Sequence, residues 1–185
     1  METDSHEHDS ALYSQLEDSY GKINYSYTTQ VIKASGLKKQ DNILKWLQMI
    51  LSALSTGGFI SSLITNNTVS VWVSGLCSTM LLVLTAYFKD NNLSFTYQKH
   101  LDTSNKLWLI REQYLSLLTD FDTLSREEVT ERRNTLQEKA AKIYEEAPLT
   151  DDKSYSLAQK ALKNNESQFF SREELNLMLP ENLRK

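Results

Sequence analysis

Formal charge is missing from one long stretch of this sequence. Residues 46–88 contain no Asp, Glu, Lys, Arg or His, although the chain has 20 basic and 24 acidic side chains. Glycine and proline are also scarce, at five and two residues, which argues against a loop-rich or all-β fold and favours long helices. The only cysteine, Cys77, lies inside the uncharged stretch, so one chain cannot form a disulfide framework.

The sequence also lacks the motifs of an enzyme or a metal site. It has no glycine-rich phosphate loop, no nucleophile elbow and no paired-carboxylate signature, and its three histidines fall in no metal-ligand motif. We therefore expect no catalytic residue, no metal and no resident cofactor. Beyond Lys89 bases and acids nearly balance and no basic face stands out, so a nucleic-acid duplex is not expected as a partner.

The uncharged stretch is long enough to cross a membrane twice. It would make about 65 Å of helix, whereas the hydrocarbon core of a bilayer is about 30 Å thick. Four polar residues, Thr65 to Thr68, divide it into the segments 43–65 and 69–88. So short a connection predicts an antiparallel transmembrane hairpin. The alternative, a hairpin buried in a soluble protein, rarely runs so far without a charged residue.

Basic residues flank the hairpin on both outer sides. Three lysines lie before or at the start of the first span and three follow the second, whereas the connecting turn has no base. These residues are Lys38, Lys39, Lys45, Lys89, Lys99 and Lys106. Positive charge collects on the cytoplasmic side of membrane proteins. The pattern therefore predicts a multi-pass protein of the cell membrane with both termini in the cytoplasm.

Outside the hairpin the sequence predicts helices. Residues 1–11 are polar and acidic and are expected to form a disordered tail. Residues 12–42 carry apolar side chains at three- and four-residue steps, which predicts an N-terminal cytosolic helix that ends near Gly36. Residues 89–185 predict a cytosolic helical region. The expected fold is an all-α membrane protein, in which a two-helix transmembrane hairpin is joined to a cytosolic bundle of N- and C-terminal helices.

Four helices are expected after the hairpin. The first could continue directly from the second span, with an apolar face formed by Leu101, Ser104, Trp108, Leu115, Leu118 and Phe121. The second opens at Ser125, which has capping-box spacing to Glu128, and ends at Pro148. Thr150 or Asp151 caps the third. The fourth opens at a second capping box, at Ser171, and stops at Pro180.

Small and hydroxylated residues recur along both predicted spans. Such residues let membrane helices approach closely and hydrogen-bond to each other. The same residues could instead line a wet pore once several hairpins assemble, and both roles remain open. The candidate residues for pore lining or hairpin packing are Ser52, Ser55, Gly58, Ser62, Thr65, Ser74, Gly75, Ser78, Thr79 and Thr85.

Several bases share the helix that opens at Ser125. Together they are candidate contacts for an anionic ligand, although glutamates are interspersed among them, and such a mixture more often forms a solvated face. The candidates are Arg126, Arg132, Arg133, Lys139 and Lys142.

One cytosolic segment resembles a known family. Ile143-Tyr144-Glu145-Glu146-Ala147-Pro148 ends one helix, and Tyr155, Ala158 and Ala161-Leu162-Lys163 lie in the next. With the N-terminal helix and the tight hairpin, this order resembles the SLATT family of bacterial two-transmembrane effectors, over about residues 12–165. Residues 166–185 lie outside the resemblance, and their role is open.

The resemblance implies a function in bacterial anti-phage defence. Members of the family are associated with enzymes that make nucleotide second messengers, and they are thought to breach the inner membrane when infection is sensed. For this chain the resemblance implies a homo-oligomer in the lipid bilayer, regulated by a cyclic nucleotide or oligonucleotide from a partner nucleotidyltransferase. Pore formation would then lead to growth arrest or cell death. The alternative is a membrane-anchored adaptor whose cytosolic helices recruit a partner protein.

Overall fold

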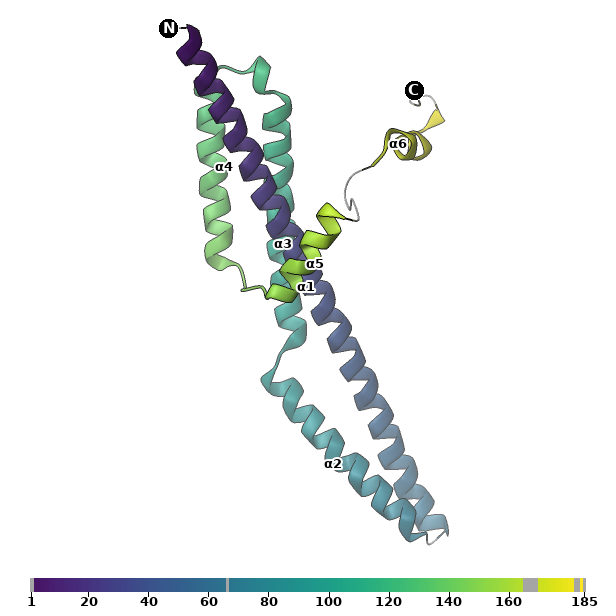
Figure 1. Cartoon of the computed structure of the whole chain (residues 1–185). Helices are drawn as coiled ribbons and strands as arrows, with labels where there is room; N and C mark the ends of the chain where they lie inside the picture. Colours follow the sequence, from purple (N-terminus) through teal and green to yellow (C-terminus); the bar gives the residue numbers. More distant parts are fainter. Residues whose placement is uncertain (1, 66, 165–169, 182–183, 185) are drawn as a thin grey trace. The chain divides into compact units, whose positions relative to one another are not determined.

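The structure is a computed structural model, which describes residues 2–65, 67–164, 170–181 and 184, with side chains from residue 9 onward. In these residues the regular structure is helical throughout, and the predicted all-α membrane fold is confirmed (Figure 1). The elements are α1 (Glu2–Thr65), α2 (Thr68–Asp90), α3 (Leu93–Thr119), the short 3₁₀ helix η1 (Phe121–Thr123), α4 (Arg126–Glu146), α5 (Asp152–Lys163) and α6 (Arg172–Met178).

The chain forms two compact units. The hairpin unit comprises residues 33–102, and the helical unit comprises residues 1–32 and 103–185. Helices α1 and α3 contribute residues to both units. The boundary that the sequence predicts between residues 42 and 43 is not marked by any break in α1.

Helix α1 begins earlier and ends later than the N-terminal helix that the sequence predicts. Residues 2–11 are helical, where a disordered tail was expected, and the carboxylate of Asp9 pairs with Arg126 at 2.8 Å. The helix also runs through Gly36, where an end was expected. A glycine costs a helix only about 1 kcal/mol relative to alanine, and the neighbouring side chains of Ala34 and Leu37 are buried in the hairpin unit.

The helical unit is held together by apolar side chains of α1, α3 and α4. Each helix turns one stripe inward, and the stripes form one cluster of buried residues: Leu12, Leu16, Ile23, Leu107, Ile110, Tyr114, Leu117, Val129, Leu136 and Ala140. The apolar face that the sequence predicts for residues 12–42 contributes Leu12, Leu16 and Ile23 to this core. The face predicted for α3 is confirmed at Ser104, which is buried, and at Leu118 and Phe121, which pack against the core. It is wrong at Trp108 and Leu115, which are exposed, whereas their neighbours Leu107 and Tyr114 are buried.

Among the residues whose side chains are described, Tyr114 is the largest that is fully buried. Burial raises the pKa of its hydroxyl above 10.0, and a hydrogen bond with Ser19 partly opposes that shift. The phenol is therefore neutral at physiological pH. Its ring adds apolar volume to the core, and its hydroxyl contacts Ser19 of α1.

Helix α5 packs against α1 in the same unit. Asp151 is its N-cap, since its Oδ1 accepts the backbone N–H of Ser154 at 2.7 Å, and Ala158 is fully buried. The rings of Tyr25 and Tyr155 lie 6.1 Å apart between the two helices. The sequence left Thr150 and Asp151 open as caps, and the structure selects Asp151.

Both predicted capping boxes are confirmed, at Ser125 and at Ser171. At the start of α4, the backbone N–H of Ser125 donates to Glu128 Oε2 at 2.9 Å, and the backbone N–H of Glu128 donates to Ser125 Oγ at 3.3 Å. These bonds satisfy two donors that would otherwise lack partners at the helix end. The hydrogen bonds from the Ser125 backbone and side chain lower the pKa of Glu128 below 4.5.

Replacing Ser125 by alanine is expected to lower the free energy of unfolding of the helical unit by about 1 kcal/mol. Urea unfolding of the full chain in detergent, followed by circular dichroism, measures the change. Ser116→Ala is the control, since Ser116 is an exposed serine on α3 and caps no helix. Equal destabilisation by the two substitutions would contradict the assignment.

The same prediction has a pH dependence. Because the pKa of Glu128 is lowered in the folded state, its contribution is present above the ordinary glutamate pKa and disappears as the pH falls through the folded-state value. The difference between the wild type and Ser125→Ala should therefore shrink below about pH 4.5. A difference that persists unchanged in acid would contradict this account.

Candidate functional site

The hairpin of α1 and α2 is closed by a tight turn. Helix α1 ends at Thr65, and Asn67 caps α2 because its Oδ1 accepts the backbone N–H of Val69 at 3.0 Å. Asparagine is among the preferred residues at this position. So short a connection makes the two helices antiparallel, and the hairpin predicted from the sequence is confirmed (Figure 1).

The outer surface of the hairpin is apolar. The helices that end at Thr65 and begin at Thr68 are long and apolar enough to cross a membrane, and only 0% and 11% of their most apolar windows are buried. Many large side chains are exposed, among them Trp46, Leu54, Phe59, Leu63, Ile64, Trp72, Leu82 and Val83. The core helix of a soluble protein would be largely buried. A surface of this kind requires lipid around it.

The two helices of the hairpin touch through small residues. A Cβ atom added at Gly58 would lie 3.2 Å from Cβ of Ser74, so the glycine allows the backbones to approach closely. One turn away on each helix, the hydroxyls of Ser55 and Ser78 are hydrogen-bonded to each other. Ser62, Ser74 and Cys77 are buried in the same unit. Close approach at small residues is typical of helix contacts in membranes.

Five other hydroxyl groups of the hairpin are hydrogen-bonded within their own helices. Ser62 donates to the carbonyl of Phe59 at 2.7 Å, and Ser74 donates to that of Val71 at 3.0 Å. On the exposed surface, Thr65, Thr79 and Thr85 donate to the carbonyls of Ser61, Gly75 and Leu81. A polar group without a partner is costly in hydrocarbon. These bonds allow the hydroxyls to sit in lipid.

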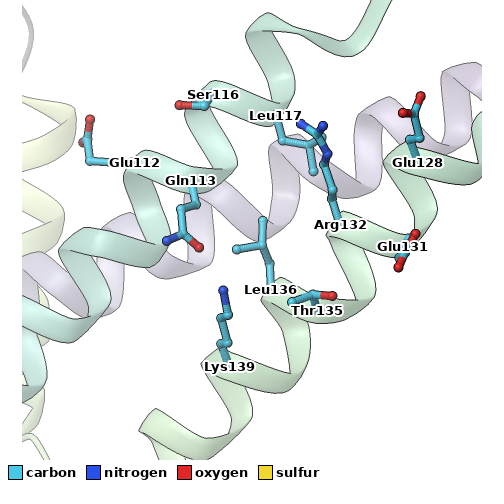
Figure 2. A pocket seen from close by; sticks show the side chains of 10 residues that line it. All are labelled: Glu112, Gln113, Ser116, Leu117, Glu128, Glu131, Arg132, Thr135, Leu136 and Lys139. Carbon is cyan, nitrogen blue, oxygen red and sulfur yellow. The ribbon is translucent and has the colours of Figure 1, made fainter. Parts of the chain in front are cut away.

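A shallow groove lies between α3 and α4 in the helical unit, with a volume of about 610 Å³. Its lining residues are Glu112, Gln113, Ser116, Leu117, Glu128, Glu131, Arg132, Thr135, Leu136 and Lys139 (Figure 2). Arg132 and Lys139 both belong to the predicted set of anion contacts. They are two turns apart on α4, which places them about 10 Å apart along the helix axis.

The other three predicted anion contacts lie elsewhere. Arg126 is paired with Asp9, Arg133 donates to Oε1 of Gln15 at 2.7 Å, and Lys142 is exposed outside the groove. The five bases therefore do not converge on one point, because spacing along one helix distributes them around it.

The charge of the groove does not favour an anion. Glu112, Glu128 and Glu131 oppose the two bases, so the lining carries more acid than base. A second hollow, of about 460 Å³ between α1 and α5, also has an acidic excess, with Glu17 and Asp18 against Lys22. A phosphate ligand would need these carboxylates displaced or neutralised by a partner.

A family model described as the SMODS and SLOG-associating 2TM effector domain family 4 matches residues 12–174. The chain belongs to this family. The match begins within α1, covers α2 to α5 and reaches into α6, which is further than the resemblance seen in the sequence. No curated protein and no solved structure matches this chain.

Membership in this two-transmembrane effector family agrees with the geometry of the hairpin. Apolar exposure on α1 and α2, the tight turn at Asn67 and the family match together place the protein in a membrane.

In the helical unit, no group of three or more His, Cys, Asp or Glu side chains with the geometry of a metal site occurs among the described residues.

The structure divides the ten candidate residues of the hairpin between two environments. Half of them meet where the helices touch: Ser55, Gly58, Ser62, Ser74 and Ser78. The other half are exposed on the outside: Ser52, Thr65, Gly75, Thr79 and Thr85. Cys77 is also buried, although it was not among the ten candidates. Its position three residues after Ser74, on the same helix face, is the signal that could have identified it.

Proposed function

We propose that this effector permeabilises the bacterial inner membrane as a homo-oligomer during anti-phage defence, which arrests growth or kills the cell. The observation that carries the proposal is the exposed half of the small residues in the hairpin. Contact between α1 and α2 uses only one face of each helix, and Ser52, Gly75, Thr79 and Thr85 remain exposed among large apolar side chains. These residues are available for contacts with further copies.

Membrane physics supports assembly through these faces. Lipid tails are as apolar as leucine, so helices associate through close packing and hydrogen bonds between small residues. The hairpin has no charged side chain between residues 46 and 88, whereas selective ion and proton pathways are usually marked by such groups. A coarse opening wetted by hydroxyls suits this hairpin better than a selective transporter, and no catalytic role is proposed.

Regulation by a nucleotide second messenger is the second part of the proposal. The family description names association with SMODS and SLOG domains, and the family is linked to enzymes that make nucleotide signals. A ligand shifts an assembly equilibrium only by its difference in affinity between the two states. The groove between α3 and α4 has more acidic than basic side chains in its lining, which disfavours direct binding of a nucleotide there. This supports a signal that acts through a partner protein, or a nucleotide site that forms only when copies of the chain assemble.

The topology proposed for the membrane has both termini in the cytoplasm. Lysines flank the hairpin on its two outer sides, and the turn between Thr65 and Thr68 carries none. The helical unit would then meet signals made inside the cell. Two variants test this topology, one with a cysteine introduced at residue 67 and one with a cysteine introduced at residue 150. The two cysteines should be labelled from opposite sides of the membrane.

The exposed hydroxyls of the hairpin provide the main test. Combined replacement of Ser52, Thr79 and Thr85 by leucine should abolish uptake of a membrane-impermeant DNA dye when the chain is expressed in bacteria together with its signalling partner. The hairpin contact should survive, because these residues lie outside it. The matched control replaces three exposed apolar residues by others: Leu54→Ile, Met80→Leu and Leu82→Ile. Full dye uptake by the triple leucine variant would refute pore formation.

A membrane-anchored adaptor is the second candidate, and one surface favours it. Trp108, Leu109 and Leu115 are 47%, 53% and 41% exposed on α3, and apolar side chains outside the bilayer are typical of protein contacts. An adaptor should tolerate the leucine substitutions in the hairpin and lose function when Trp108 is replaced by alanine. A pore-forming effector should give the opposite result for the hairpin.

A further inference from the structure

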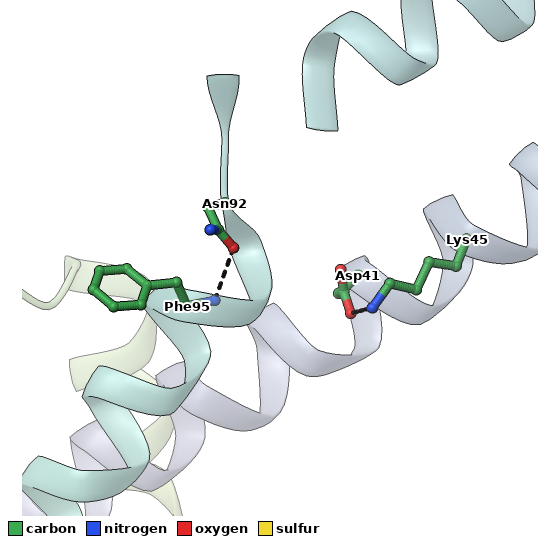
Figure 3. Close-up of polar contacts among 4 residues, drawn as sticks. All are labelled: Asp41, Lys45, Asn92 and Phe95. Atoms are coloured by element: carbon green, nitrogen blue, oxygen red, sulfur yellow. Dashed lines mark hydrogen bonds and ion pairs between the residues drawn. The ribbon is translucent and has the colours of Figure 1, made fainter. Parts of the chain in front are cut away.

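The second membrane helix is separated from the helix that follows it by two asparagines. Helix α2 ends at Asp90, α3 begins at Leu93, and α1 is continuous in the same unit. Asn91 has φ −108° and ψ 84°, outside the helical region. The backbone N–H of Phe95 donates to Asn92 Oδ1 at 3.1 Å (Figure 3). Asparagines that bond to nearby backbone in this way favour a break in a helix.

The start of α3 is firmly packed within the hairpin unit. Leu93 and His100 of α3 are buried, as are Ala34, Leu37 and Asp41 of α1. The ammonium of Lys38 lies 5.0 Å from the centre of the Tyr97 ring, which adds a cation–π contact between the two helices. Residues on the far side of the asparagines therefore have a fixed position against α1.

The adjacent half of α2 is held much less firmly. No residue from Ser78 to Asp90 is buried, and the buried residues of α2, Ser74 and Cys77, lie toward the turn at Asn67. Apart from the hydrogen bond between Ser55 and Ser78, one hydrogen bond joins this half to α1 among the described residues. Gln40 Nε2 donates to the hydroxyl of Tyr87, and this bond is long, at 3.5 Å, and exposed. In Figure 1, α1 and α2 separate progressively from the turn toward the end of α2 that leads into α3.

We propose that Asn91–Asn92 is a flexible joint, or pivot, which uncouples α2 from α3 and lets the adjacent half of α2 move toward and away from α1 by tilting about the contact near the turn. The contact between Gly58 and Ser74 holds the two helices together near the turn, and the start of α3 stays on α1 during the motion. The pivot thus opens and closes one end of the hairpin without unpacking the helix that follows. This motion goes beyond the proposed function and does not depend on pore formation.

Distances between spin labels test the pivot in the full chain, reconstituted in lipid nanodiscs with Cys77 replaced by alanine. Double electron–electron resonance is measured for three pairs of exposed positions. The first pair, Met49 and Val83, joins α1 to the half of α2 next to the pivot. The second pair, Ile60 and Val73, lies near the turn, and the third, Lys39 and Ser94, joins α1 to α3. The first pair should give a broad or two-peaked distribution. The other two pairs should each give one narrow peak.

Filling the break with helix formers should remove the motion. Alanine is the best helix former, and it lacks the side-chain cap of asparagine. The double substitution Asn91→Ala and Asn92→Ala should join α2 to α3 and reduce the first pair to one narrow peak. Asn42→Ala, an exposed position in α1, is the control and should leave the broad distribution unchanged. A narrow first pair in the parent protein, or a broad one in the double variant, would overturn the pivot.

Discussion

Substitution of Gly58 by leucine is expected to separate the two membrane helices where they touch. Even a Cβ atom at this position would lie 3.2 Å from Cβ of Ser74, and leucine adds three further carbons. Overpacking of this kind costs about 1–3 kcal/mol. The contact is measured by a disulfide between cysteines at positions 55 and 78, whose native hydroxyls are hydrogen-bonded, with Cys77 replaced by alanine. Oxidation in membranes should cross-link the parent and leave the leucine variant largely reduced.

Gly75 provides a matched control for this substitution. It is a glycine in the same hairpin, and nothing lies within 4 Å of a Cβ atom added to it. Gly75→Leu should therefore insert into the membrane and cross-link between positions 55 and 78 like the parent. If Gly58→Leu cross-links equally well, the helices do not pack through Gly58 and Ser74, and the assignment of inner and outer faces fails with it.

Truncation of Leu107 to alanine should have the largest effect on the helical unit. Leu107 has 0% exposure and belongs to the core shared by α1, α3 and α4. Replacing a buried leucine by alanine loses transfer free energy and leaves a cavity, which together cost about 2–5 kcal/mol. Urea unfolding of the full chain in detergent should show this as a lower midpoint with little change in the dependence on denaturant.

Leu109 on the same helix is the control, because it is the same residue type and is 53% exposed. Leu109→Ala should change the free energy of unfolding by no more than about 0.5 kcal/mol. Equal losses for the two leucines would show that the inward face of α3 has been assigned wrongly. The sequence alone predicted that Trp108 and Leu115 faced the core, so this pair of variants separates the two assignments.

Features with a local physical cause were predictable from the sequence. The absence of charge between residues 46 and 88 and the polar residues from Thr65 to Thr68 predicted the hairpin, because lipid excludes charge and a short turn fixes the direction of the chain. Ser125 and Ser171 marked the starts of α4 and α6, because a capping box is contained within four residues.

Features that depend on distant partners were not predictable. Helix α3 has apolar residues on more than one face, and only the positions of α1 and α4 decide that Leu107 is buried while Trp108 is exposed. Arg126 pairs with a residue 117 positions earlier in the chain, Asp9, which no spacing rule connects to it. The continuity of α1 through Gly36 likewise depends on packing, which offsets a weak local preference.

The direction of the hydroxyl bonds in the hairpin has a consequence for the ion preference of the proposed pore. Thr65, Thr79 and Thr85 each give their hydrogen to a carbonyl of their own helix, so each leaves its oxygen lone pairs for other ligands. An opening wetted by these faces would surround a passing ion with electron-rich atoms. Such surroundings replace the hydration shell of a cation better than that of an anion, and they would bias the leak toward potassium and sodium over chloride.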